Sequence, residues 1–225
     1  SLAVGTVACY RLKRTNHPLN SVPRGGEGGP LIVAESLSTG KQVLSASDIT
    51  RCLTRIAHEI LERNGDLEDV VLLGIPSAGA PLAQRLADAL YEVQSQNPDV
   101  ISPRRVQAGT LDITMYRDDL GRHPIRMPAP TRIPQGRVEG RTIILVDDVL
   151  YSGRSIRAAL DALSAIGRAE RVQLAVLIDR GHRQLPIRAD YVGKNLPTHK
   201  DETVVVSLTE LGAAADSAEL RPTRA

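Results

Sequence analysis

The sequence contains no Trp and no Phe, and only 5 of its 225 residues are Tyr. Proteins that hold single-stranded RNA by stacking its bases rely on aromatic side chains. That mode of RNA binding is therefore disfavoured here. Cysteine is also scarce, since Cys9 and Cys52 are far apart and lack metal-ligand spacing. We expect both to be free thiols in a reducing compartment.

Long apolar runs are missing as well. No segment approaches the roughly 18 consecutive apolar residues that a membrane-spanning helix needs. The start of the chain lacks the basic residues and the cleavage site of a signal peptide. We therefore expect a cytoplasmic protein that does not enter a membrane. The net charge of +2 is small, so it permits a local basic patch without requiring nucleic acid as a partner.

Both ends of the chain have the composition of tails. Cys9–Gly40 contains a glycine and proline cluster without periodicity, and the residues after Ala213 are small and polar. We predict disordered tails at residues 1–41 and 212–225. One folded domain is expected at residues 42–211, which is long enough to enclose a core.

Within that domain, apolar β-branched runs alternate with helical patterns. The expected strands are Val70–Ile75, Thr142–Val146, Val172–Ile178 and Val204–Leu208, and the expected helices are Ser47–Asn64, Pro81–Gln94 and Ser155–Ile166. Near-continuous apolar strands are typical of a parallel sheet covered on both faces. The alternation therefore predicts a doubly wound α/β domain. The polar stretch Leu111–Pro134 is too long for a turn, so we expect a mobile lid or binding loop there.

The most informative segment is an apolar run that leads through paired carboxylates and a tight loop into a helix. It consists of Ile143, Ile144, Leu145, Val146, Asp147, Asp148, Val149, Leu150, Tyr151, Ser152, Gly153, Arg154 and Ser155. We predict that the strand ends at the carboxylates. On the helix that follows, the predicted apolar side carries Ile156, Leu160, Leu163 and Ile166.

The order of these groups indicates a particular ligand. In open α/β sheets, ligands bind beyond the carboxyl ends of the strands. The loop N–H groups, the hydroxyls of Ser152 and Ser155 and the helix N-terminus would form a cradle for a phosphate. Asp147 and Asp148 would repel a phosphate, but they can accept hydrogen bonds from two neighbouring ribose hydroxyls. Carboxylates followed by a phosphate cradle are the arrangement of a phosphoribosyl site.

Other interpretations of this segment are weaker. A strand–turn–helix with acidic residues at the sheet edge would explain a lone Asp-Asp pair, but the whole arrangement is far more specific. The segment has no Gly-Lys-Ser/Thr ending, so it is not a Walker motif. It also lacks the three glycines of a dinucleotide-binding fingerprint.

Ile143–Ser155 resembles the signature with which type I phosphoribosyltransferases bind phosphoribosyl pyrophosphate (PRPP). Further segments narrow the resemblance to the PyrR family, bacterial regulators of pyrimidine operons that are also uracil phosphoribosyltransferases. These segments are Leu53–Ile60, Leu111–Leu120, Val176–Arg183 and Leu185–Asn195. The resemblance implies a type I phosphoribosyltransferase fold over residues 42–211. Such a fold has a central, mostly parallel sheet flanked by helices, a small hood and a flexible loop.

The resemblance also implies a reaction, in which uracil and PRPP give UMP and pyrophosphate. Mg²⁺ would be carried mainly by PRPP rather than by a dedicated protein site. Asp147 and Asp148 would hold the ribose, directly or through metal-bound water. The flexible loop would contribute Tyr116, Arg117, Asp118 and Asp119, and the base would be read through backbone groups near Ile178, Asp179 and Arg180. A purine phosphoribosyltransferase remains open as an alternative.

The chain departs from the family where pyrophosphate is expected. This site would include Ser77, Ala78 and Gly79, whereas the family usually has Thr-Arg-Gly. A backbone nest survives the change, but a methyl group cannot replace a guanidinium. We therefore expect weakened turnover with nucleotide binding retained.

The helix expected at Ser47–Asn64 has an apolar stripe and a basic face. At about 100° per residue, the stripe carries Ile49, Leu53, Ile56 and Ile60. Arg51, Arg55 and His58 lie almost opposite. An ordinary solvated face explains this pattern equally well, and the histidines have no metal-ligand spacing.

In PyrR-like proteins, by contrast, the matching positions bind RNA. The resemblance therefore implies a surface for a hairpin in the leader of a pyrimidine-operon mRNA. Its expected residues are Arg51, Thr54, Arg55, His58, Arg63, His182, Arg183 and Lys194. Gln184 stands where the family usually has Glu.

UMP or UTP would stabilise the RNA-competent state, and a homo-oligomer is expected. The alternative function is a dedicated salvage phosphoribosyltransferase without RNA regulation.

Overall fold

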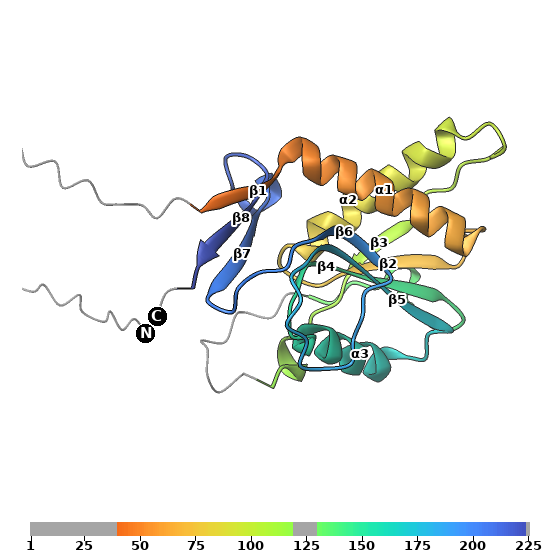
Figure 1. Ribbon diagram of the computed structural model, residues 1–225. Coiled ribbons are helices and arrows are strands. Elements are labelled where there is room, and N and C mark those ends of the chain that lie inside the picture. Colours follow the sequence, from red (N-terminus) through yellow and green to blue (C-terminus); the bar gives the residue numbers. More distant parts are fainter. Residues whose placement is uncertain (1–39, 119–129, 224–225) are drawn as a thin grey trace, which may run out of the picture. The chain divides into compact units, whose positions relative to one another are not determined.

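The computed structural model describes residues 40–118 and 130–223. Almost all of the predicted N-terminal tail, with Cys9, lies outside the described residues, as does Asp119. In the part that is described, five strands form a parallel sheet in the order β3-β2-β4-β5-β6. Three further strands form a separate antiparallel sheet in the order β1-β8-β7, which we call the small sheet (Figure 1).

The elements follow one another along the chain, with a long connection from β3 to β4, residues 111–141. The strands are β1 (Lys41–Ser45), β2 (Val70–Gly74), β3 (Gln107–Thr110), β4 (Thr142–Leu150), β5 (Arg171–Asp179), β6 (Tyr191–Asn195), β7 (Glu202–Ser207) and β8 (Ser217–Pro222). The helices are α1 (Ala46–Asn64), α2 (Gly79–Gln96) and α3 (Arg154–Ile166), with 3-10 turns η1 (Thr114–Tyr116), η2 (Pro134–Gly136) and η3 (Thr209–Leu211). None of the described helices is long and apolar enough to cross a membrane.

The parallel sheet is buried on both faces. Along β2, Leu72 packs into the hydrophobic cluster of α1 and α2, whereas Val71 and Leu73 pack into that of α3. Figure 1 shows α1 and α2 on one side of this sheet and α3 on the other. The doubly wound α/β arrangement expected from the apolar strands is therefore confirmed.

Helix α1 begins with a capping box. The Ser45 hydroxyl accepts a hydrogen bond from the Asp48 N–H (3.3 Å), and the Asp48 carboxylate accepts one from the Ser45 N–H (2.9 Å). Hydrogen bonds from Ser45 lower the pKa of Asp48 to about 2. The predicted apolar stripe is confirmed, since Ile49, Leu53, Ile56 and Ile60 are all buried. Cys52 on this helix is a free thiol, and its burial raises its pKa.

Two predictions about Ile143–Ser155 and the helix that begins there were wrong in detail. Strand β4 does not end at the carboxylates but runs through them to Leu150, because β5 continues beside it and Leu150 pairs with Asp179. On α3, Leu160 and Ile166 are 37% and 40% exposed. Ile156 and Leu163 are buried as predicted, but the helix completes its buried side with Ala158, Ala159 and Ala162. Alanines form part of its contact with the sheet, and they give a weak hydrophobic signal in the sequence.

The prediction of a disordered C-terminal tail was wrong. Ser217–Pro222 forms β8, the middle strand of the small sheet, and β7 pairs with it rather than with the parallel sheet. Only Ala218 of β8 is fully buried, so the segment shows no apolar pattern. Its backbone is satisfied by strands on both sides, which local sequence does not reveal.

A side chain of α2 fastens the small sheet to the main domain. The Arg85 guanidinium donates to Glu210 (2.6 Å) and to Asp216 (2.5 Å), which lies just before β8. These hydrogen bonds lower the pKa of both carboxyl groups and raise that of Arg85.

Candidate functional site

The end of β4 and the start of α3 form a small cradle. The chain leaves β4 after Leu150 and enters α3 at Arg154 through Gly153, whose φ of 90° is strained for any residue with a side chain. A cavity of about 220 Å³ lies here. It is lined by Val149, Leu150, Tyr151, Ser152, Gly153, Arg154, Ser155 and Ile156, together with Arg117, Asp118 and Asp147. Backbone N–H groups, hydroxyls and a helix N-terminus meet there, as a phosphate requires.

The two carboxylates at this edge have different environments. Asp147 is buried, and Asp148 is half-buried. Burial, followed by the charge of Asp148, raises the pKa of Asp147 well above its usual range, although Arg117 counteracts this. Asp147 accepts a hydrogen bond from the Asp148 N–H (3.0 Å), and Asp148 accepts one from the Val149 N–H (2.8 Å). Backbone groups thus orient both side chains, and a hydroxyl or cationic partner would relieve their repulsion.

A second cavity is lined by both carboxylates and has a volume of about 340 Å³. It shares Asp147, Val149, Ser155 and Arg117 with the cradle. Its other lining residues are Ile75, Pro76, Ser77, Ala78, Ile113, Asp148, Val204, Val205, Val206 and Leu211. Asp147 therefore borders both the cradle and a larger cavity, which Asp148, the β2–α2 turn and β7 also line.

The β2–α2 turn contains the residues expected at the pyrophosphate site. The structure brings Ser77 and Ala78 to the second cavity. Gly79 begins α2, and a Cβ atom there would lie 2.3 Å from the Val146 carbonyl oxygen. Glycine is therefore needed to let α2 start in contact with β4. In the described part of the chain, Arg117 is the one basic residue that lines this cavity.

The described part of the expected lid lies against the start of α3. Arg154 forms an ion pair with Asp118 (2.5 Å), and Arg157 donates a hydrogen bond to the Tyr116 carbonyl (3.3 Å). Arg117 lines both cavities. The structure thus brings Arg117 and Asp118 to the cradle and Tyr116 to the first turns of α3.

The residues expected to read the base lie at the end of β5 and just beyond it. Neither cavity of the described chain is lined directly by Ile178, Asp179 or Arg180. Ile178 is buried in the core, and Asp179 pairs with Arg183. The apolar wall of the second cavity is instead the edge of β7, Val204–Val206. The sequence predicts Val204–Leu208 as a strand of the parallel sheet and therefore does not reveal that its residues form the wall of a cavity.

Most residues of the expected RNA surface gather where α1 meets β6. Arg55 donates a hydrogen bond to the Gly193 carbonyl (2.5 Å), next to Lys194, whose ammonium reaches the Val43 carbonyl (3.3 Å). Arg63 pairs with Asp190 (2.8 Å). Further along the outer face of α1 are Arg51, His58 and the half-buried Thr54, and Arg51 is paired with Asp48.

His182 and Arg183 lie beside the cradle instead. Arg183 donates to the carbonyl of Tyr151 (2.8 Å) and pairs with Asp179. Its guanidinium is therefore used inside the protein. His182 Nε2 is 2.7 Å from the Thr198 carbonyl oxygen. Gln184 accepts a hydrogen bond from Arg154 (3.0 Å) and so lies next to the same loop.

In the part of the chain that the structure describes, no three His, Cys, Asp or Glu side chains gather as a metal site. The pair Asp147 and Asp148 is nevertheless a donor set that suits Mg²⁺, because hard cations prefer carboxylate oxygens. Its place at the second cavity, which shares Asp147 with the cradle, fits a metal ion that arrives with a phosphorylated ligand.

Comparison with known proteins first defines the class. The model of the phosphoribosyl transferase domain matches residues 39–211. A hypoxanthine phosphoribosyltransferase from Staphylococcus aureus has a TM-score of 0.57 at 17% identity, covering 81% of this chain and 92% of that one. The enzyme from Trypanosoma cruzi has a TM-score of 0.55 at 18% identity, covering 82% and 97%. These two structures share the fold, and the chain carries a phosphoribosyltransferase domain.

Relatives of higher identity narrow the class. The bifunctional protein PyrR of Streptomyces coelicolor is 61% identical over 170 residues, which are 76% of this chain and 84% of that protein. The bifunctional protein PyrR of Roseiflexus sp. is 58% identical over 180 residues, covering 78% and 92%. The chain belongs to the PyrR family.

Proposed function

We propose that this protein is a uracil phosphoribosyltransferase that also binds the leader of a pyrimidine-operon mRNA under the control of UMP or UTP. The observation that carries the enzymatic part is that Asp147 lines both the cradle and the second cavity, while its neighbour Asp148 lines the second. Membership in the PyrR family supports both parts.

Each of the two cavities would hold a different part of the ligands. The 5′-phosphate would accept hydrogen bonds from the loop amides and from the hydroxyls of Ser152 and Ser155. The ribose hydroxyls would donate to Asp147 and Asp148. Pyrophosphate and uracil would share the second cavity, with pyrophosphate near Ser77 and the base near Val204–Val206. Uracil is small and flat, so an apolar wall can pack on it without an aromatic ring.

In the reaction, the bond from C1′ to pyrophosphate breaks and a bond from C1′ to uracil N1 forms, while N1 loses its proton. Mg²⁺ carried by PRPP would neutralise part of the departing charge. The protein contributes positioning and electrostatic stabilisation, and a closing lid would exclude water. Because Ala78 offers no guanidinium, we expect slow turnover with UMP binding retained.

An acceptor and binding assay tests the enzymatic part. With PRPP and Mg²⁺, uracil should yield UMP, whereas hypoxanthine should yield no IMP. Replacing both carboxylates, Asp147→Asn with Asp148→Asn, should weaken UMP binding about 100-fold, because two charge-assisted hydrogen bonds are lost at about 1.5–3 kcal/mol each. Asp69→Asn, an exposed position just before β2, is the control. Unchanged affinity in the double variant would refute the site, and preference for hypoxanthine would make the protein a purine enzyme.

The RNA-binding part rests on α1. Arg51 and His58 are exposed on its outer face, and the neighbouring Arg55 and Lys194 add positive charge where α1 meets β6. Such side chains suit phosphate contacts and hydrogen bonds in a hairpin loop. We further propose that the protein works in the cytoplasm, where its mRNA and nucleotides are, and that it forms a homo-oligomer, which light scattering would detect.

A gel shift with the leader hairpin tests this part. UMP should tighten RNA binding. His58→Ala or Arg51→Ala should weaken it by about fivefold, the value of one hydrogen bond of about 1 kcal/mol, and UMP formation should be unchanged. Arg168→Ala, an exposed position beyond α3, is the matched control. UMP formation without any RNA shift would leave a dedicated salvage enzyme.

A further inference from the structure

Arg180 is a buried cation held by uncharged partners. Its side chain lies just beyond β5, and the residue is only 5% exposed. The guanidinium donates hydrogen bonds to the Thr198 hydroxyl (3.0 Å) and to the carbonyls of His199 (3.3 Å) and Glu202 (2.5 Å). Burying a charge is costly unless its donors are satisfied. All three of these partners belong to one segment, residues 198–202, which we call the hood turn.

The other side of the same guanidinium faces the cradle. Its Cζ atom lies 4.2 Å from the centre of the Tyr151 ring, a cation–π distance. Tyr151 lines the cradle, and the backbone N–H of Arg180 donates to the carbonyl of Leu150, the residue before Tyr151 (3.1 Å). One side chain therefore joins the loop that would hold the phosphate to the hood turn.

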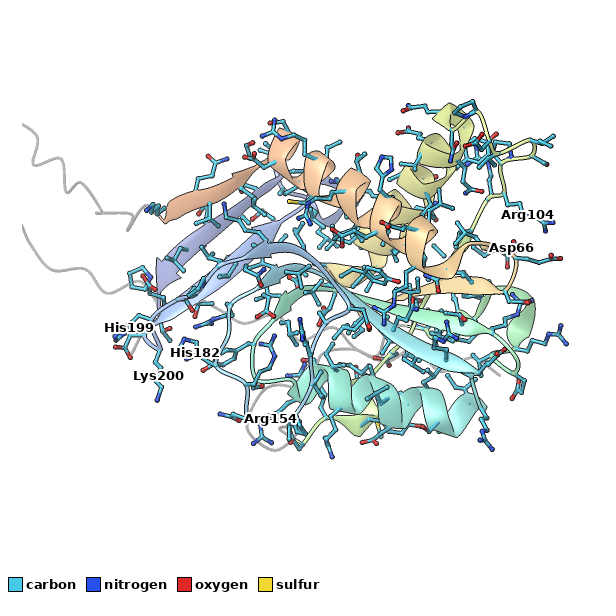
Figure 2. The ribbon with its side chains drawn as sticks, turned by 45° about the vertical axis from the view of Figure 1, so that its right-hand side comes forward. Asp66, Arg104, Arg154, His182, His199 and Lys200 are labelled. Atoms are coloured by element: carbon cyan, nitrogen blue, oxygen red, sulfur yellow. The ribbon has the colours of Figure 1, made fainter. Side chains whose placement is uncertain are left out.

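His182 makes a second connection between the same two places. Its ring meets the Tyr151 ring edge-on, with centres 6.0 Å apart, and its Nε2 contacts the Thr198 carbonyl. Figure 2 shows His182, His199 and Lys200 together at one end of the molecule, near Arg154 and opposite Asp66 and Arg104. The hood turn thus presents His199 and Lys200, which are both exposed, beside a residue of the expected RNA surface.

We propose that Arg180 is a positioning residue that transmits occupancy of the phosphate cradle to the hood turn. The inference rests on the proposed function, because it requires a nucleotide in the cradle. A bound phosphate holds the loop that follows Tyr151, the fixed ring restricts Arg180, and the guanidinium then holds residues 198–202 more firmly. The ordered turn offers His199 and Lys200 to the phosphates of an RNA bound at His182. No displacement of backbone is needed, since a loss of motion is sufficient to couple two sites.

A purely structural anchor is the competing explanation, and it makes a different prediction. An anchor would hold the hood turn equally well with and without nucleotide. A transmitting residue makes the stability of the turn depend on occupancy. By linkage, whatever UMP does to the turn must also appear as a change in RNA affinity.

Amide hydrogen exchange of the full chain, with and without saturating UMP, separates the two. In the wild type, UMP should slow exchange at residues 198–202 by about fivefold or more, the usual lower range of such coupling. Arg180→Gln should abolish this response at UMP concentrations that calorimetry shows to be saturating. Tyr151→Leu should abolish it too, although it leaves every hydrogen bond between Arg180 and the turn in place. Arg188→Gln, an exposed arginine of the same β5–β6 connection, should respond like the wild type.

The outcomes are distinct. If UMP binds but exchange at residues 198–202 does not change, or if Tyr151→Leu responds like the wild type, Arg180 is only an anchor and the inference is wrong, while the proposed function stands. If UMP does not bind, the proposed function fails and takes the inference with it. Should Arg180→Gln fold poorly, Tyr151→Leu still decides the matter, because a retained response in that variant would contradict transmission.

Discussion

The phosphate cradle and the small sheet are two halves of one candidate site, and they are built in opposite ways. The cradle is built mainly from one continuous segment, the end of β4 and the start of α3, to which Arg117 and Asp118 are added. The small sheet combines β1, β7 and β8, which lie near both ends of the described chain. Long-range strand pairing has a higher entropic cost than local structure. One part of a binding site can thus be formed by residues that are close in sequence, while another part requires strands from distant segments.

The two halves also differ in how they are held. Strand β4 lies between β2 and β5 in the parallel sheet, so hydrogen bonds from both sides support the cradle. The small sheet is fastened to α2 by Arg85 and to the end of β5 by Arg180. The cradle should therefore resist changes that release the small sheet.

The largest difference between the cradle and the small sheet is expected when the chain is ended after Leu211. Removing β8 takes away the middle strand between β1 and β7, so both should lose protection from hydrogen exchange. The amides of β4 should stay protected. UMP affinity should fall about tenfold or more, since Val204–Val206 would no longer hold the second cavity; this loss corresponds to about 1.4 kcal/mol. A chain ending at Thr223 is the control, and persistent protection of β1 and β7 in the shorter chain would contradict a role for β8.

Asp147→Asn should change the pH dependence of stability through the cradle alone. Burial and Asp148 raise the pKa of Asp147, so the folded state holds its proton more tightly than the unfolded state does. The native carboxyl therefore favours folding below its unfolded pKa near 3.8, and that advantage is lost as the pH rises toward the folded pKa. At pH 7.5 the variant should melt about 2 °C or more above the wild type, and the difference should shrink as the pH falls toward 4.

The same variant should bind UMP about tenfold more weakly, because a carboxylate acceptor is lost. Thermal unfolding from pH 4 to 8 and calorimetry with UMP measure the two effects, with Asp69→Asn as control. A lower melting temperature at pH 7.5 would show that the buried carboxylate stabilises the fold rather than serving the ligand.

The smallest expected effect concerns the fastening of the small sheet. Arg85→Gln removes the charge that pairs with Glu210 and Asp216, and the free energy of unfolding should fall by about 1–2 kcal/mol. Exchange should rise in β8 and remain unchanged in β4. Arg105→Gln, an exposed arginine beyond α2, is the matched control. Equal effects on β4 and β8 would mean that the two halves unfold as one unit.

Much of the main domain was predictable from the sequence. Continuous apolar strands indicated a sheet covered on both faces, and the stripe of α1 is buried as expected. The order of apolar run, carboxylates, glycine and helix predicted the position of the cradle. The prediction failed where a residue's role depends on distant partners: β8 has a single fully buried side chain, and Val204–Val206 line a cavity only because β7 pairs with β8.

The expected RNA surface illustrates the same limit of prediction from sequence. The periodicity of the apolar residues of α1 predicts which face of the helix is exposed, and Arg51 and His58 lie on that face. The hydrogen bonds of the Arg183 guanidinium to the carbonyls of Tyr151 and Ile187 do not follow from such a pattern, because they depend on how the β5–β6 connection folds back. Sequence shows that a residue is charged, whereas packing decides whether that charge is available to a partner.

By itself, the sequence determined the elements whose interactions are local: the helices, the buried face of α1, the central strands, and the loop that leads from Asp148 to α3. Only the tertiary structure decided that the C-terminal segment is a strand, that β7 closes the second cavity, and that Arg180 bridges the cradle and the hood turn. The reason is physical. Local periodicity records which side of an element avoids water, but hydrogen bonds and ion pairs between distant segments depend on positions that no short stretch of chain contains.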